Sequence, residues 1–169
     1  MKVGRLLGRE ESVATQRLLL RTARQDDLAS LGWLGGALAP DWTLDDLSPH
    51  VAAGEAVVMS VRDGGPVGLA VVLLGQPISG AACVPFIAID PAARFRGLGG
   101  EAGLALERLT RERWQARRAL APVPERRGLA VYFWLRLGYR PLTQAEAPWP
   151  LVGLNGRVGP GIWMARDFS

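Results

Sequence analysis

Apolar positions recur along the chain with two different periods, and the two kinds of segment alternate. Short apolar runs bounded by charge, glycine or proline predict strands, which lie at 17–21, 56–62, 67–74, 83–89, 118–123 and 162–168, with a further strand opening at Tyr139. Apolar residues at three- and four-residue steps predict helices, which lie at 28–34, 44–51, 97–114 and 129–137. This order predicts an α/β (α+β) fold with a largely antiparallel sheet. We expect one domain over residues 17–169, after a leader at 1–16 that either is mobile or adds an edge strand.

Composition narrows the class of protein without naming its chemistry. With 49% hydrophobic and 21% charged residues, the chain is typical of packed globular domains. Apolar runs such as 67–74 are far shorter than the roughly 20 residues that span a bilayer, so we expect no membrane partner. The first residues lack the long apolar core of an export signal, which predicts a cytoplasmic location. Cys83 is the only cysteine, so we expect neither a disulfide nor a metal site.

The net charge of +4 is carried almost wholly by arginine, because Lys2 is the only lysine. Arginine suits a phosphate-bearing partner, and it equally suits a solvated surface that keeps the protein soluble. No zinc-ligand, helix-turn-helix or RNA-binding signature accompanies these residues, so we expect no nucleic-acid partner.

The segment between the strand at 83–89 and the helix at 97–114 carries the candidate chemistry. Three glycines lie at the first turn of this helix: Gly97, Gly99 and Gly100. Glycine leaves the free N–H groups of a helix start open to an anion, and Arg94 and Arg96 add positive charge beside them. The alternative is that the glycines only allow close packing of the helix. A Walker loop needs Gly-Lys-Ser/Thr, which is absent, and the glycine spacing is wrong for a dinucleotide fingerprint.

Two motifs in this order resemble the GCN5-related N-acetyltransferase (GNAT) superfamily. Arg94-Phe95-Arg96-Gly97-Leu98-Gly99 is similar to its Gln/Arg-x-x-Gly-x-Gly/Ala acyl-CoA loop, and residues 130–139 are similar to its late Ala-x-x-Phe-Tyr-x-x-Leu-Gly-Phe segment. The resemblance covers residues 17–168. It implies a mixed, mostly antiparallel sheet of six or seven strands flanked by helices. It also implies that the parallel fourth and fifth strands splay apart, with acetyl-CoA in the gap.

The resemblance also implies which residues bind acetyl-CoA. The backbone of Ile87, Ala88 and Ile89 would pair with the pantetheine arm. The pyrophosphate would meet the amides of Arg94, Phe95, Arg96, Gly97, Leu98, Gly99 and Gly100. Arg127 replaces an asparagine that often opens the late helix, and it would meet a CoA phosphate. Trp134 stands where many relatives have a tyrosine that protonates the departing thiolate, and an indole N–H is no useful acid.

The leading hypothesis is therefore transfer of an acetyl group from acetyl-CoA to a primary amine of a small-molecule or peptide acceptor, with the catalytic residues unassigned. The alternative, motivated by Trp134, is a noncatalytic acyl-CoA-binding or regulatory domain. His50 is expected to be a surface or partly packed residue, and Cys83 a small core residue, rather than catalytic ones. The sequence does not identify the acceptor, and it leaves a homodimer open.

Overall fold

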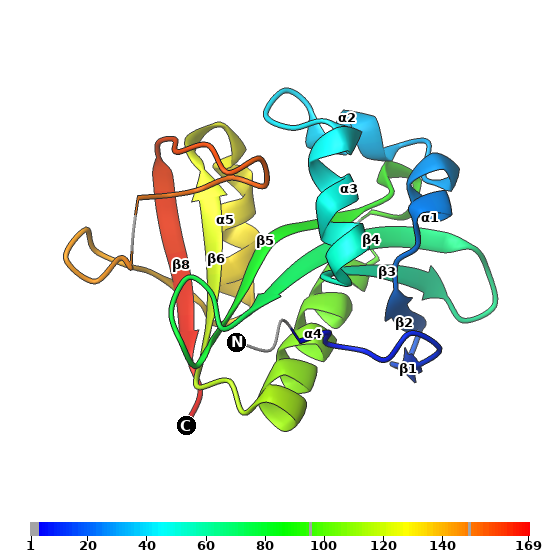
Figure 1. Ribbon diagram of the computed structural model, residues 1–169, viewed down its shortest axis with the longest axis horizontal. Coiled ribbons are helices and arrows are strands. Elements are labelled where there is room, and N and C mark those ends of the chain that lie inside the picture. The colour runs from blue at the N-terminus through cyan, green and yellow to red at the C-terminus, as the bar shows by residue number, and fades with distance from the viewer. Residues whose placement is uncertain (1–3, 95, 149) are drawn as a thin grey trace.

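The computed structural model describes residues 4–94, 96–148 and 150–169 and contains one eight-stranded sheet (Figure 1). The strands are β1 (Ser12–Ala14), β2 (Leu18–Thr22), β3 (Ala56–Val61), β4 (Pro66–Leu74), β5 (Ala81–Ile89), β6 (Arg118–Pro124), β7 (Arg140–Pro141) and β8 (Gly161–Asp167). The helices are α1 (Gln25–Ser30), α2 (Leu34–Leu38), α3 (Leu44–Ala53), α4 (Leu98–Trp114) and α5 (Leu129–Arg136), with short 3-10 turns η1 (Pro91–Ala93) and η2 (Glu125–Arg127).

The strand order is β1-β2-β3-β4-β5-β6-β8-β7, and every neighbouring pair is antiparallel except β5 and β6. The predicted mixed, mostly antiparallel sheet is thus confirmed. It has one strand more than the six or seven expected, because Ser12–Ala14 in the predicted leader pairs with β2 as the edge strand β1. Leu6 and Leu7, also in that segment, are buried in the core.

The helix predicted over 28–34 is wrong in one respect, because two short helices occupy this region. α1 ends at Ser30, and α2 begins at Leu34 after a turn. Leu28, Leu31 and Leu34 are nevertheless all buried. The same spacing of leucines is therefore compatible with two short helices, because apolar periodicity indicates which residues are buried and not whether the helix is continuous.

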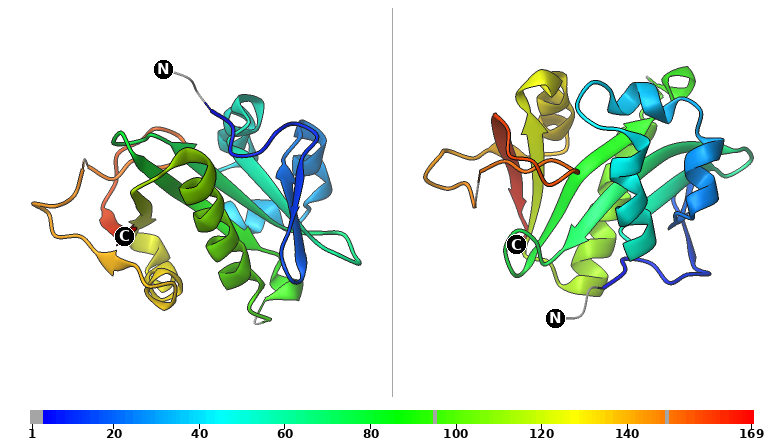
Figure 2. Two further views of the ribbon diagram at one scale, coloured as in Figure 1. Left: turned by 90° about the horizontal axis from the view of Figure 1, so that it is seen from below. Right: turned by 45° about the horizontal axis from the view of Figure 1, so that its top comes forward.

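Helices cover both faces of the sheet (Figures 1 and 2). α1, α2 and α3 pack on one face over Val58, Val71 and Phe86. α4 and α5 pack on the other face, where Leu106 and Trp134 meet Ala121 in the largest buried cluster. Alternate residues of the same strands thus serve two separate cores, as the two-residue period of a strand requires. No helix of the described residues is both long and apolar enough to cross a membrane.

β5 and β6 form the opening in the sheet that the resemblance implied. They pair only where Ala81–Cys83 meets Arg118–Leu120, and beyond these residues the two strands diverge (Figure 1). Pro85 and Pro122 each stand two residues beyond the last paired residue of their strand. Proline lacks an N–H group, so neither residue can donate a hydrogen bond that would extend the ladder.

Candidate functional site

The loop from Asp90 to Gly97 leads from the end of β5 to the start of α4. The Asp90 carboxylate accepts a hydrogen bond from the Ala92 N–H at 2.9 Å and opens the turn η1. Gly97 has φ of +74° and caps α4 in the left-handed conformation, which favours glycine. The helix then begins at Leu98, and its first-turn amides have no partner within the helix, as at every helix start. Phe95, one of the expected contacts, lies outside the described residues.

Arg17, just before β2, holds this loop in place. Its Nη1 donates to the carbonyl of Arg96 at 2.6 Å, and its Nε lies 3.4 Å from the carboxylate of Glu101 in the first turn of α4. Arg17 therefore adds a cation beside Arg94 and Arg96, and it offsets a carboxylate that would otherwise repel an anion. The sequence analysis missed Arg17, because the contact joins residues 79 positions apart and no local pattern marks it.

The backbone of β5 presents two of the three expected residues to the gap. The Asp90 N–H donates to the Val67 carbonyl of the neighbouring segment at 2.7 Å. Hydrogen-bonding direction alternates along an antiparallel pair, so Ala88 points its backbone groups at β4. Ile87 and Ile89 point theirs toward β6, where the β5–β6 ladder has already ended. The Ile89 carbonyl accepts a hydrogen bond from Arg94 Nε at 3.4 Å.

The glycines of α4 serve packing as well as access. A Cβ at Gly99 would lie 3.3 Å from Phe133, and a Cβ at Gly103 would lie 2.8 Å from Leu137. Both partners lie on or just after α5, so α5 approaches α4 closely beside the loop. The structure therefore supports the packing interpretation at Gly99, whereas Gly97 is required by the turn itself and Gly100 makes only ordinary contacts.

Trp134 and Arg127 lie apart from the loop. Trp134 is 4% exposed, and its ring centroid lies 4.9 Å from that of Phe133 and 4.8 Å from that of Tyr139. The indole is thus part of the core behind the gap. Arg127 donates to the Asp41 carboxylate at 3.0 Å and to the carbonyls of Ala37 and Leu38, and its guanidinium lies over the ring of Trp42. A contact between Arg127 and a CoA phosphate would require these bonds to break.

A cavity of about 230 Å³ opens on the opposite face of the sheet, at the point where the strands diverge. Pro85 of β5, Pro122 of β6 and Trp163 of β8 line it, together with His50 of α3 and residues 152–154 of the β7–β8 connection. Cys83 also lines the cavity. Burial raises the pKa of its thiol, so it supplies no thiolate nucleophile.

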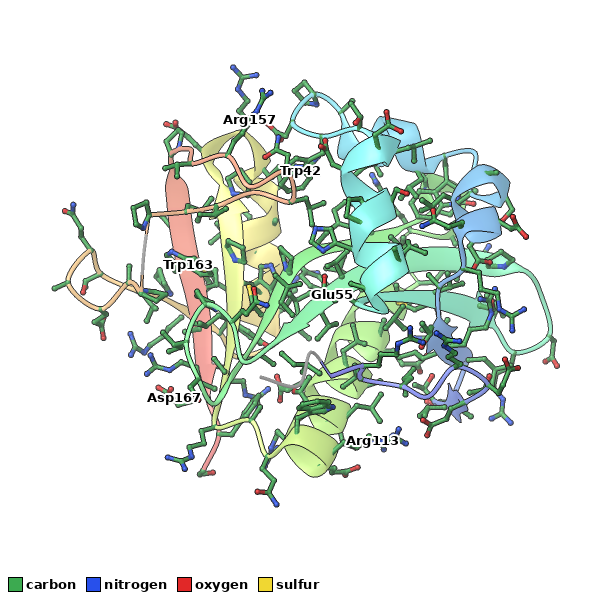
Figure 3. All side chains as sticks on the ribbon, in the orientation of Figure 1. Trp42, Glu55, Arg113, Arg157, Trp163 and Asp167 are labelled. Atoms are coloured by element: carbon green, nitrogen blue, oxygen red, sulfur yellow. The ribbon has the colours of Figure 1, made fainter. Side chains whose placement is uncertain are left out.

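His50 is one of a pair of titratable residues at this cavity, and its partner Glu55 was not found from the sequence. His50 Nδ1 lies 2.7 Å from Glu55 Oε2, and His50 Nε2 lies 3.2 Å from the carbonyl of Leu154. Glu55, labelled in Figure 3, directly precedes β3. The strand at 83–89 itself carries no carboxylate, so Glu55 brings one to the cavity from outside that strand. No group of His, Cys, Asp or Glu among the described residues could hold a metal ion.

Comparison with known proteins places this arrangement in a familiar class. No family model and no curated protein matches the sequence. Among solved structures, a proposed ribosomal-protein-serine acetyltransferase from Vibrio cholerae has 18% identity and a TM-score of 0.73, covering 95% of this chain and 99% of the other. A GNAT-family acetyltransferase from Staphylococcus aureus has 12% identity and a TM-score of 0.67, covering 89% and 98%. An acetyltransferase from Bacillus subtilis in complex with CoA has 16% identity and a TM-score of 0.63, covering 90% and 99%.

The chain thus has the fold of acetyltransferases. This is the fold that the resemblance to the GNAT superfamily implied. Identities this low carry the fold alone, so activity has to be argued from the site.

Proposed function

We propose that this protein is an N-acetyltransferase that moves an acetyl group from acetyl-CoA to a primary amine. One observation carries the proposal: the Gly97 turn and the cavity lie on opposite faces of the sheet, and the divergence of β5 and β6 joins them. A donor held on one face and an acceptor held on the other would meet between the two strands. The Bacillus subtilis neighbour, whose structure contains CoA, shares this fold.

The described residues fit acetyl-CoA by charge and by shape. The first-turn amides of Leu98, Gly99 and Gly100 would bind the pyrophosphate, since a helix start favours anions by about 0.3–1 kcal/mol. Arg94, Arg96 and Arg17 would balance its charge. The backbone groups of Ile87 and Ile89 would pair with the pantetheine arm as an added strand.

Acetyl-CoA supplies the acyl group as a thioester. The neutral amine nitrogen forms the new bond to the carbonyl carbon and the carbon–sulfur bond breaks. The proton that the amine loses passes, directly or through water, to the departing thiolate, so the products are the amide and free CoA. This chain contributes mainly position, because it orients the two reactants on either side of one gap. The buried indole of Trp134 supplies no proton. The His50–Glu55 pair is the titratable couple at the acceptor side.

The noncatalytic alternative rests on Trp134 at the usual position of the acid. A protein that only senses acyl-CoA has no need of a second cavity across the sheet, so the cavity favours an enzyme. One measurement distinguishes the two functions: an enzyme releases CoA in the presence of a suitable amine, and a noncatalytic protein does not. Binding of acetyl-CoA without release of CoA, over a broad panel of primary amines, would support the noncatalytic function.

The binding step is tested by thermal-shift titration with acetyl-CoA on the wild type, Gly97→Glu and Gly156→Glu. Both glycines are left-handed, with φ of +74° and +75°, so both variants carry the same backbone strain and the same added charge. Gly156 lies in the β7–β8 connection. A ligand at 100 times its Kd stabilises the native state by about 2.7 kcal/mol. We expect this shift in the wild type and in Gly156→Glu, and little shift in Gly97→Glu. No shift in the wild type would refute the proposal.

A further inference from the structure

The wall of the cavity is predominantly apolar. Its apolar side chains include those of Leu73, Pro77, Pro85, Pro122, Val152 and Trp163. Gln76 and His50 supply the polar side chains that line it besides the Cys83 thiol. Basic residues in this chain are nearly all arginine, yet none of the described residues that line the cavity is arginine or lysine. An acceptor bound here would therefore meet mostly apolar surface and no arginine or lysine side chain.

His50 is the titratable side chain on the described wall besides the Cys83 thiol, and both of its ring nitrogens already lie beside oxygen atoms of the protein. His50 faces the Glu55 carboxylate through Nδ1 and the Leu154 carbonyl through Nε2. Glu55 is mostly buried, with its side chain 15% exposed, so its negative charge acts close to the cavity. A positively charged ammonium group is compatible with this surrounding. A carboxylate or phosphate would lose its hydration and would find no arginine, no lysine and no free His50 nitrogen to replace it, which is costly.

The volume limits the size of the group that fits. The cavity has a volume of about 230 Å³, which is well above what one water molecule needs and is suited to a small organic group. A phenyl ring with a two-carbon arm is of this order. A bulky sugar or a folded peptide would have to remain largely outside.

We infer that the acceptor is a compact primary amine with an apolar body and without a carboxylate or phosphate next to the amine. This inference rests on the proposed N-acetyltransferase function and names the substrate class of the same site. The apolar body occupies the cavity between Pro85, Pro122 and Trp163, and the amine faces the gap between β5 and β6.

The test compares 2-phenylethylamine with phenylalanine, which differ only by the carboxylate next to the amine. We expect kcat/KM for 2-phenylethylamine to exceed that for phenylalanine at least tenfold. Val152→Arg, at a rim residue that is 38% exposed, should supply the missing cation and narrow this preference several-fold. Ile162→Arg is the matched control, because Ile162 is 39% exposed. It precedes Trp163 on β8, so its side chain points to the other face of the sheet. The control should keep the wild-type preference.

The outcomes separate this inference from the proposed function. If amines are acetylated but phenylalanine is used as well as 2-phenylethylamine, the substrate class is wrong and the function stands. A peptide with an N-terminal serine that is used better than 2-phenylethylamine would lead to the same conclusion. If acetyl-CoA binds and no amine releases CoA, the function is wrong. The substrate class, which rests on that function, is then overturned with it.

Discussion

The contact between Gly103 of α4 and Leu137 predicts that one substitution changes stability in opposite directions in two backgrounds. A Cβ at Gly103 would lie 2.8 Å from Leu137 Cδ1, whereas carbon atoms in contact prefer about 3.5–4.0 Å. Gly103→Ala therefore forces the end of Leu137 to move. In a helix without such a neighbour, the same change is favourable, because alanine has the higher helix propensity.

The size of the effect follows from these two opposing terms. Overpacking of a tight core contact costs about 1–3 kcal/mol, and the gain in helix propensity is about 1 kcal/mol. Gly103→Ala should thus lower the free energy of unfolding of the wild type by about 1 kcal/mol, within about 0–2 kcal/mol. This corresponds to a fall in Tm of about 2–4 °C for a chain of this length. Once Leu137 is alanine, the obstruction is gone, and Gly103→Ala should stabilise by up to about 1 kcal/mol.

Urea unfolding of four proteins measures both terms: the wild type, Gly103→Ala, Leu137→Ala and the double variant. The double-mutant cycle isolates the contact, and we expect a coupling energy of about 1–3 kcal/mol. The reasoning fails if Gly103→Ala stabilises the wild type as much as the Leu137→Ala variant. A coupling energy under about 0.5 kcal/mol would also refute it, because α5 would then not be held against α4 through this contact.

Two further predictions concern charged residues. Arg17→Gln removes the hydrogen bond to the Arg96 carbonyl and a cation beside the loop. One exposed charge contributes about 1 kcal/mol to binding, so calorimetry should show three- to tenfold weaker acetyl-CoA binding. Unchanged affinity would leave Arg17 without this role. The bidentate hydrogen bonds from Arg21 hold the pKa of Asp27 below its usual range. This ion pair therefore stabilises the fold at pH values above the unfolded-state pKa of Asp27, and the stabilisation is lost as the pH falls through its folded-state pKa. Asp27→Asn should therefore lower the free energy of unfolding by about 1–2 kcal/mol at pH 7, allowing for partial solvent screening. Urea unfolding should show a smaller loss at pH 3, and an equal loss at both pH values would contradict this link between the pKa and stability.

The strand, loop and helix around the candidate site could be predicted because their signals are local. Alternating and helical apolar periods fix β5 and α4, and the glycine at 97 marks the left-handed turn between them. The parallel, splayed pair of strands came from the family resemblance, and the three-residue ladder between β5 and β6 confirms it. The break between α1 and α2 was missed because the buried leucines keep one spacing through both helices.

The side chains that complete the site could not be predicted, because their partners are distant in sequence. Arg17 meets the loop across 79 residues, and His50 meets the Leu154 carbonyl across 104 residues. Glu55 lies only five residues from His50. A His and a Glu at that spacing are common on protein surfaces and do not by themselves indicate a site. Only the fold, which places the two residues beside a cavity, marks them as candidate functional residues.

Arg127, which stands where the family pattern often has an asparagine, connects the two sides of the gap between β5 and β6. Only the three-residue ladder between β5 and β6, with the Arg117 N–H to Gly80 carbonyl hydrogen bond beside it, joins the backbones of the two parts of the described sheet. Arg127, which follows β6, reaches the connection between α2 and α3 through Asp41 and through the carbonyls of Ala37 and Leu38. It thus ties the strands on one side of the gap to the helices that pack on the other side. An asparagine is too short for such a set of contacts, since a guanidinium offers five donors on a long stem. Arg127 therefore helps to hold the two sides of the gap together.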